Sequence, residues 1–265
     1  MTYALVTGAS CGIGAEFAKL FALDGKSLVL CSSPRSRAAL TTFAEQLRKQ
    51  HGVEVHTLSV DLAKPGAARY LIQLVETLGV EIETLVNNAG AGIVGLPFHE
   101  YDSEQFSAML HLNVMALSEL AMHYVPQMVR RRRGRVLNVS SSAGYVVPHG
   151  LEAGYAASKA YVISLSEGLA YDLRRTGVTC THLAPGPTRT NFFQAAGLVD
   201  ERRMARLGFS SPESVAKVGY DAMNRGRSSV MPGLSNTLVT WLARISPSKS
   251  LTGKISAWVV SRDLG

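Results

Sequence analysis

The chain has 265 residues, of which 46% are hydrophobic, and this length and composition suit one large α/β domain. We expect no membrane-spanning helix, because no stretch approaches the ~18 uninterrupted apolar residues that such a helix requires. The first residues also lack the basic segment of a signal peptide. The three cysteines are dispersed, without the spacing of a metal site or a disulfide framework. The sequence therefore predicts free thiols, no metal and a cytoplasmic location.

The net charge is +7, and its most visible cluster is the arginine run at residues 130–133, followed by Arg135. Such a run can form a patch for nucleic acid or for an anionic membrane surface. It can also be the solvated end of a helix, where arginines complement the helix dipole before Gly134 ends the helix. No nucleic-acid-binding motif accompanies the run, so we expect the helix end and no nucleic-acid partner.

Strand-like apolar runs alternate with helical patterns along most of the chain. Strands are expected at residues 3–7, 27–31, 53–60, 84–86, 135–140 and 179–184, with 228–231 as a seventh candidate. Helices are expected at residues 13–21, 40–47, 67–78, 103–128 and 156–176, with Asp102 as the cap of the fourth. The alternation predicts an α/β fold: a single-domain, doubly wound parallel sheet (Rossmann fold) over residues 1–232, with helices on both faces. Ligands in this architecture bind at the carboxyl ends of the strands.

A glycine-rich segment joins the first strand to the first helix, with Gly8, Gly12 and Gly14 as its glycines. Glycines here permit a tight turn and let the backbone approach a pyrophosphate at the helix N-terminus. A plain strand-to-helix turn is the alternative, but three glycines in seven residues exceed what such a turn needs. The segment also matches the GxSxG nucleophile elbow of hydrolases. Too little chain precedes Ser10, however, to supply the oxyanion donor of that elbow.

Tyr155 and Lys159 stand four residues apart, a spacing that places both on one face of a helix. A free tyrosine has a pKa near ~10, too high for efficient acid-base work at neutral pH. A nearby ammonium favours the phenolate, so we expect Lys159 to lower the pKa of Tyr155 and to donate to a nicotinamide ribose. Taken alone, this pair is equally typical of an ordinary helix surface. Its significance depends on the motifs that accompany it.

Five segments, in order and on the expected elements, carry recognisable motifs: residues 7–14, 87–90, 137–141, 155–159 and 185–190. They resemble the motifs of the short-chain dehydrogenase/reductase family, and in particular its bacterial NADP-dependent ketoacyl and carbonyl reductases. The resemblance covers about residues 3–190. It implies an oxidoreductase that passes hydride between a nicotinamide dinucleotide and a carbonyl or alcohol.

The resemblance also implies a role for each catalytic residue. Tyr155 would exchange a proton with the substrate oxygen, and Ser141 would hydrogen-bond that oxygen and stabilise its developing charge. Asn113 resembles the helix asparagine that holds a proton-relay water near Lys159; a tolerated polar residue is the less favoured alternative. Counting forward along the strand selects Ser141, whereas the usual family interval before Tyr155 selects Ser142. We prefer Ser141, because strand geometry is stiffer than loop length.

The cofactor preference depends on the end of the second strand, where NAD enzymes usually carry an acid that accepts from the ribose hydroxyls. Here Ser32 and Ser33 are followed by Arg35 and Arg37, without an acid, which favours the 2′-phosphate of NADP(H) over NAD. Cys11 keeps NAD as the alternative, because many NADP members of the family carry a basic residue there. The expected cofactor contacts are Gly8, Ser10, Gly12, Ile13, Gly14, Ser32, Ser33, Arg35, Asp61, Leu62, Asn88, Ala89, Gly90, Tyr155, Lys159, Pro185, Gly186 and Thr188.

The substrate is less determined by the sequence. Residues 187–210 contain Phe192 and Phe193 and are expected to form a lid. Together with other apolar side chains they favour a hydrophobic ketone or a 3-oxoacyl compound, unless they are core or interface. Those other side chains are Ile93, Val94, Val146 and Val147.

The segment 233–265 is an amphipathic extension that we expect to pack on the same domain; it could instead contact a membrane surface or a partner subunit. A homodimer or homotetramer is expected. The alternative function is a nucleotide-binding redox sensor of the same fold, without turnover.

Overall fold

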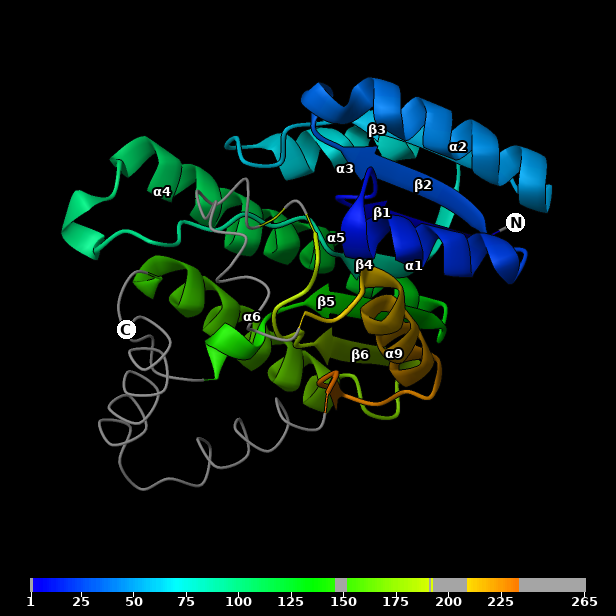
Figure 1. The fold of residues 1–265 in the computed structure, drawn as a ribbon. Helices are drawn as coiled ribbons and strands as arrows, with labels where there is room; N and C mark the ends of the chain where they lie inside the picture. Colours follow the sequence, from blue (N-terminus) through cyan, green and yellow to red (C-terminus); the bar gives the residue numbers. More distant parts are fainter. Residues whose placement is uncertain (1, 146–151, 191, 193–208, 234–265) are drawn as a thin grey trace.

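The computed structural model describes residues 2–145, 152–190, 192 and 209–233. Its centre is a parallel sheet of seven strands in the order β3-β2-β1-β4-β5-β6-β7, as Figure 1 shows. The strands are β1 Thr2–Thr7, β2 Ser27–Ser32, β3 Val55–Ser59, β4 Glu81–Asn87, β5 Gly134–Val139, β6 Val178–Leu183 and β7 Ser229–Val230. The order reverses at β1, so the carboxyl ends of β1 and β4 flank the switch point where such folds bind ligands. The predicted α/β fold, including its seventh strand, is confirmed.

Helices cover both faces of the sheet because successive strand residues point to opposite sides. The helices are α1 Gly12–Leu23, α2 Arg37–His51, α3 Ala67–Thr77, α4 Ser103–Leu110, α5 Leu117–Arg130, α6 Ala153–Asp172 and α9 Pro212–Asn224. On one face, Val6 and its neighbours pack against α1, α2 and α9. On the other face, Leu5 and its neighbours pack against α3, α5 and α6. Two apolar layers therefore enclose the sheet.

The long helix expected at residues 103–128 is interrupted. The side chain of Asp102 accepts a hydrogen bond of 2.8 Å from the Gln105 N–H and caps α4, as predicted. A π-helical segment, His111–Ala116, then separates α4 from α5. Such segments are rare and often lie at functional sites. In Figure 1, α4 lies on the side toward which the strand arrows point.

The arginine run begins at the end of a helix, as predicted, but Gly134 does not end that helix. Helix α5 ends at Arg130, and Arg132, not a glycine, takes the left-handed conformation with φ 54°. Gly134 is instead the first residue of β5, where a Cβ would lie 2.5 Å from the Met128 side chain. The expectation that Gly134 ends the helix is therefore wrong, because packing against Met128 is what requires a glycine there.

Acidic side chains from β4 meet this arginine run at the amino ends of the strands. Arg131 lies 3.4 Å from Glu81, and Arg133 lies 3.0 Å from Glu83. Burial opposes ionisation of Glu83, but its hydrogen bond from Thr2 and the nearby cations hold its pKa below the usual value. Part of the run is thus paired within the chain.

Among the described residues, no helix is both long and apolar enough to span a bilayer. The expected lid at 187–210 is described only in part, and residues 234–265 of the expected extension lie outside the described residues. The strands run from Thr2 to Val230, within the residues 1–232 that the sequence predicts as the domain.

Candidate active site

The loop between β1 and α1 is packed so tightly that it has room only for glycine at one key position. A Cβ at Gly14 would lie 2.3 Å from the Gly8 carbonyl oxygen and 2.4 Å from Nδ2 of Asn88. Gly8 itself has φ 65°, a left-handed conformation that favours glycine. The predicted glycine segment therefore forms a close backbone turn at the start of α1, with its backbone available to a bound group.

Thr7 and Asn88 hold this turn against β4. Asn88 Nδ2 donates to the carbonyls of Thr7 and Gly8 at 2.8 Å and 3.1 Å. The Thr7 hydroxyl oxygen accepts from the N–H groups of Asn88 and Ala89, both at 3.0 Å. The segment after β4 is thereby fixed next to the glycine turn, which brings two of the predicted motifs together.

Tyr155 and Lys159 lie on the first turns of α6, and both side chains are buried. Lys159 Nζ donates to the Val139 carbonyl at the end of β5, at 3.0 Å, and lies 5.8 Å from the centre of the Tyr155 ring. The predicted pair therefore faces the carboxyl end of the sheet.

Burial dominates the titration of this pair. It raises the pKa of Tyr155 to about 12, against a lowering contribution from the hydrogen bond with Ser141. Burial also lowers the pKa of Lys159 to about 8, because the ammonium loses its hydration. The expectation that Lys159 lowers the pKa of Tyr155 is not met here, since desolvation of the phenol outweighs the other effects.

Ser141, not Ser142, shares a hydrogen bond with the Tyr155 side chain. Ser141 lies two residues after the end of β5 in an extended conformation, and its Oγ also accepts from the Ala143 N–H at 3.2 Å. Ser142 begins a 3₁₀ turn, Ser142–Gly144, and its N–H donates to the Pro185 carbonyl at 2.9 Å. Of the two serines, the geometry brings the hydroxyl of Ser141 to Tyr155.

Asn113 lies in the π-helical segment and bridges two parts of the site. Its Oδ1 accepts from the Ala91 N–H at 2.9 Å, and its Nδ2 donates to the Ala91 carbonyl and to Ser158 Oγ. A Cβ at Gly90 would lie 3.2 Å from Lys159 Nζ and 3.3 Å from Asn113 Oδ1. Asn113 therefore joins the segment after β4 to α6, beside Lys159.

The end of β2 lies next to the glycine turn. The Ala9 N–H donates to the Cys31 carbonyl at 3.1 Å. Ser32 is buried, Ser33 precedes a 3₁₀ turn at Pro34–Ser36, and Arg35 in that turn is exposed. The segment after β2 therefore lies beside the glycine turn, with Arg35 exposed.

Asp61 and Leu62 follow β3 at the same edge of the sheet. Asp61 Oδ1 accepts from the Ala63 N–H at 3.3 Å, whereas the helix after it begins only at Ala67. Asp61 is therefore not the N-cap of α3, a position that Gly66 occupies.

The segment after β6 covers the glycine turn. A Cβ at Gly12 would lie 3.1 Å from Cγ2 of Thr190. Thr188 is buried, and its hydroxyl donates to the Gly186 carbonyl at 2.9 Å. Ile13, at the start of α1, packs against the first core layer. The predicted segments after β1, β4, β5 and β6 thus meet at one edge of the sheet.

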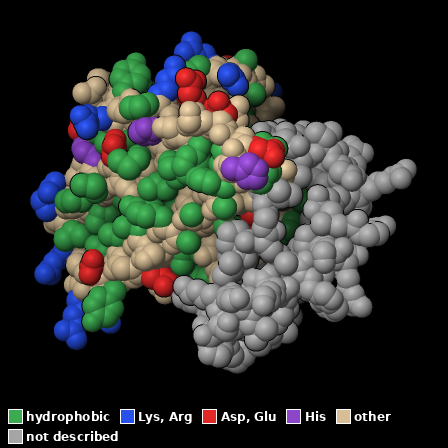
Figure 2. Space-filling model, turned by 90° about the vertical axis from the view of Figure 1, so that its left-hand side faces the viewer, with side chains coloured by type: hydrophobic (Ala, Val, Ile, Leu, Met, Phe, Trp, Pro, Cys, Tyr) green, Lys and Arg blue, Asp and Glu red, His purple; other side chains and the backbone are tan. Residues whose placement is uncertain are grey.

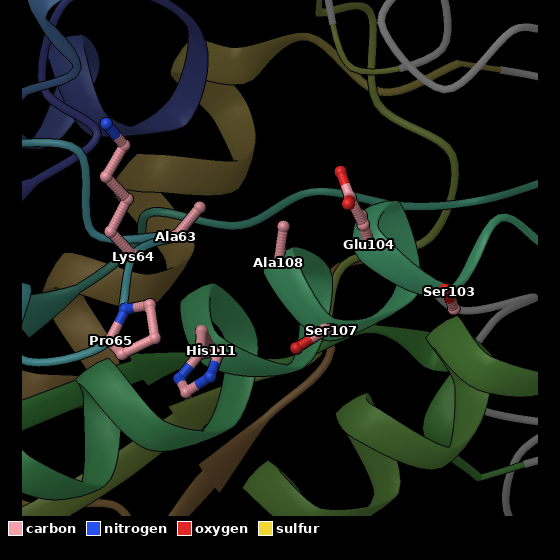
Figure 3. Close-up of a pocket in the computed structure, with 8 residues that line it drawn as sticks. All are labelled: Ala63, Lys64, Pro65, Ser103, Glu104, Ser107, Ala108 and His111. Carbon is pink, nitrogen blue, oxygen red and sulfur yellow. The ribbon is translucent and has the colours of Figure 1, made fainter.

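A hollow of about 300 Å³ begins one residue after Leu62. Figure 3 shows its two walls: the loop with Lys64 and Pro65 on one side, and α4 with Ser107 on the other. His111, at the start of the π-helical segment, also lines it. The described residues contain no cluster of three His, Cys, Asp or Glu side chains that could hold a metal.

An apolar cluster surrounds the Tyr155 ring. Its other buried members are Ile93 and Met109, and the Phe192 ring centre lies 5.2 Å from that of Tyr155. A Cβ at Gly92 would lie 2.6 Å from the Phe192 ring. Figure 2 shows hydrophobic side chains gathered on the side of the molecule where α4 lies. Of the other expected pocket residues, Val94 is half-buried and is not a member of this cluster, and Val146, Val147 and Phe193 lie outside the described residues.

Sequence reasoning missed three residues of this site. Thr7 carries part of the loop architecture, and only its place before the glycines signals this. Glu152, at the start of α6, is half-buried, and burial raises its pKa. Tyr145 ends the turn after Ser141 and hydrogen-bonds to a buried histidine of β6. No local pattern marks the last two.

Together, a doubly wound parallel sheet, a glycine turn at its switch point and a buried Tyr-Lys pair define the class of nucleotide-binding Rossmann-fold proteins with a catalytic constellation. The model of the short chain dehydrogenase family matches residues 2–198. The chain therefore belongs to the short-chain dehydrogenase/reductase family, as its five motifs predict.

Individual proteins agree with this assignment. The chain is 35% identical over 184 residues to a very-long-chain 3-oxoacyl-CoA reductase of Laccaria bicolor, covering 68% of this chain and 53% of that protein. It thus spans about half the length of that curated relative. A short-chain dehydrogenase from Sphingobium yanoikuyae in complex with NADPH superposes with a TM-score of 0.80 at 28% identity, over 94% and 98% of the two chains. A family member from Burkholderia phymatum in complex with NAD superposes with a TM-score of 0.79 at 26% identity, over 91% and 92%.

Proposed function

We propose that this protein is an NADP(H)-dependent oxidoreductase that transfers hydride between the dinucleotide and a carbonyl or alcohol. The observation that carries the proposal is the convergence of Tyr155, Lys159 and Ser141 beside a glycine turn that a Cβ at Gly14 would fill. The three side chains supply acid-base chemistry, and the glycine turn supplies a binding place for a pyrophosphate.

The close turn fits a nicotinamide dinucleotide. Gly8, Gly12, Gly14 and the first N–H groups of α1 would hold the pyrophosphate, with Ser10 and Ile13 beside them. Lys159 and Tyr155 would meet the nicotinamide ribose. The remaining proposed contacts lie around the same edge of the sheet: Ser32, Ser33, Arg35, Asp61, Leu62, Asn88, Ala89, Gly90, Pro185, Gly186 and Thr188. When bound, the dinucleotide supplies or accepts the hydride.

Tyr155 is the proposed proton donor to the substrate oxygen. With a pKa of about 12, its phenol is protonated at neutral pH, which is the form that carbonyl reduction needs. Ser141 donates a hydrogen bond to the same oxygen and stabilises its developing charge. Lys159, with a pKa of about 8, can restore a proton to the phenolate, and Asn113 holds the adjoining segment in place.

NADP(H) is the proposed cofactor, with NAD as the less favoured alternative. Support comes from the absence of an acid at the end of β2, where Ser32, Ser33 and Arg35 stand. Hydroxyls and a guanidinium complement a 2′-phosphate, whereas a carboxylate would repel it. Family members in complex with NADPH and with NAD both superpose on this chain, so the selectivity rests on these residues.

A hydrophobic ketone or a 3-oxoacyl compound is the proposed substrate. The apolar cluster around Tyr155, with Ile93, Met109 and Phe192, supports a site that receives an apolar chain. The Laccaria bicolor relative is named a very-long-chain 3-oxoacyl-CoA reductase, which is consistent with such a substrate. A redox sensor that binds the nucleotide without turnover is the second candidate, and the experiment below separates the two.

The proposal extends to assembly and location. Met115, Met122 and Tyr161 are 46%, 76% and 42% exposed on neighbouring helices, which supports a homodimer or homotetramer. Cys31 and Cys180 are buried free thiols, in keeping with a cytoplasmic location.

Residues 187–210 remain the proposed lid and 233–265 the proposed extension packed on the 1–232 domain. Membrane contact and nucleic-acid binding are not proposed.

A screen of NADPH oxidation over aldehydes, ketones and 3-oxoacyl thioesters, repeated with NADH, tests the proposal. We expect turnover with at least one apolar carbonyl, and faster turnover with NADPH. Tyr155→Phe should lower kcat at least ~100-fold while NADPH binding persists, because only the proton donor is removed. Turnover that survives in Tyr155→Phe would contradict the mechanism. NADPH binding without turnover of any substrate would favour the sensor.

A further inference from the structure

A second tyrosine lies close to Ser141 and is tied to the sheet by its hydroxyl. The Tyr145 hydroxyl and His182 Nε2 are 2.6 Å apart. His182 is fully buried within β6, between Thr181 and Leu183. A buried imidazole is costly unless it is hydrogen-bonded, so this contact is part of what lets a polar side chain occupy that position.

The contact closes the turn that begins at Ser141. The Gly144 N–H donates to the Ser141 carbonyl, and the Tyr145 N–H donates to the Ser142 carbonyl, both at 3.1 Å. Ser141 is therefore the first residue of a short hydrogen-bonded turn, and Tyr145 is the residue that leaves it. Fixing the Tyr145 side chain on β6 consequently fixes the end of the turn that is opposite to Ser141.

Backbone contacts hold the other end of the segment. The Ser140 N–H and hydroxyl both donate to the Leu183 carbonyl, and the Ser142 N–H donates to Pro185. Gly144 lies directly on α6, where a Cβ would be 2.7 Å from the carbonyl carbon of Lys159. The turn thus lies between β6 and α6, and the Tyr145 hydroxyl bond connects its far end to β6.

We propose that Tyr145 and His182 are positioning residues, whose hydrogen bond holds the Ser141 hydroxyl in reach of the Tyr155 hydroxyl. This proposal rests on the proposed function, because it assigns the pair a role in the reaction of Tyr155 and Ser141. Neither residue needs to touch the substrate. Their effect reaches the reaction only through Ser141, and this distinguishes them from a general contribution to stability.

The test is a double-mutant cycle with Tyr145→Phe and Ser141→Ala, measured with the best substrate of the NADPH screen. Tyr145→Phe keeps the ring and removes the hydroxyl, so we expect kcat to fall roughly fivefold to tenfold. The Kd of NADPH should stay unchanged. In the Ser141→Ala background the same substitution should change kcat less than twofold, because there is no longer a serine hydroxyl to position.

Tyr3→Phe is the matched control. The Tyr3 hydroxyl also donates a hydrogen bond of 2.6 Å, to Glu54, but Tyr3 is the second residue of β1 and lies at the amino end of the sheet, away from the site. We expect Tyr3→Phe to lower the melting temperature about as much as Tyr145→Phe and to leave kcat unchanged. Equal losses from Tyr145→Phe with and without Ser141, or no loss at all, would overturn the positioning role. If Ser141→Ala itself keeps full turnover, it is the proposed mechanism that fails.

Discussion

The glycine turn and the turn after β5 are both built at the carboxyl edge of the sheet, but by different means. The glycine turn relies on the absence of side chains, with 2.3 Å between a Cβ at Gly14 and the Gly8 carbonyl oxygen. The turn after β5 is held by backbone hydrogen bonds and by side chains, among them the pair Tyr145 and His182, which are 37 residues apart in the chain. The glycine turn has no room for a larger side chain at Gly14. The turn after β5 can accommodate substitutions, and we expect them to change the position of Ser141.

Gly14→Ala changes the glycine turn and should have the largest effect on NADPH binding. The added methyl group would clash with the Gly8 carbonyl and with Asn88, so the turn must shift. We expect the Kd of NADPH to rise roughly 10- to 100-fold, as overpacking of ~1–3 kcal/mol implies. Fluorescence titration with NADPH measures this, alongside a thermal melt.

Gly168→Ala provides the control for that substitution. Gly168 lies within α6, and a Cβ there would meet no atom within 4 Å. Alanine has the higher helix propensity, so this variant should be stabilised by up to ~1 kcal/mol and should bind NADPH normally. If Gly14→Ala also binds NADPH normally, the close packing of the turn does not matter for the cofactor.

The same contrast explains which features could be predicted from the sequence. The roles of Gly8, Gly14 and Asn88 could be predicted from the sequence, because the backbone of such a turn requires these residue types wherever the turn occurs. The strands were equally visible, because a buried parallel strand needs a continuous apolar run. The roles of Glu152 and of the Tyr145–His182 pair could not be predicted. Their residue types are common, and each role depends on a partner that is distant in the sequence.

Two errors in the sequence analysis have the same origin. Gly134 is required by its contact with Met128 across the start of β5, not by a helix end that it follows closely in sequence. The pKa of Tyr155 is governed by burial in the folded chain, whereas the spacing to Lys159 reveals only a neighbouring charge. In both cases tertiary packing outweighs the local pattern.

Arg35→Ala tests the outer part of the cofactor site and should have an intermediate effect. Arg35 is exposed after β2, where its guanidinium can pair with a 2′-phosphate. We expect kcat/KM with NADPH to fall about tenfold, while kcat/KM with NADH is unchanged, because NADH lacks that phosphate. Arg69→Ala, on α3, is the control. Equal losses with both cofactors would show that Arg35 does not select between them.

Glu152→Gln probes the substrate side and should have the smallest effect. The pKa of Tyr155 is raised mainly by burial, and the negative charge of Glu152 adds to that rise. Removing the charge should lower the pKa of Tyr155. Alcohol oxidation needs the phenolate, so the rising limb of its kcat/KM against pH should move to lower pH, by less than about one unit. Glu45→Gln, exposed on α2, should leave the limb in place. A limb that moves to higher pH in Glu152→Gln would show that Tyr155 is not the group whose deprotonation limits oxidation.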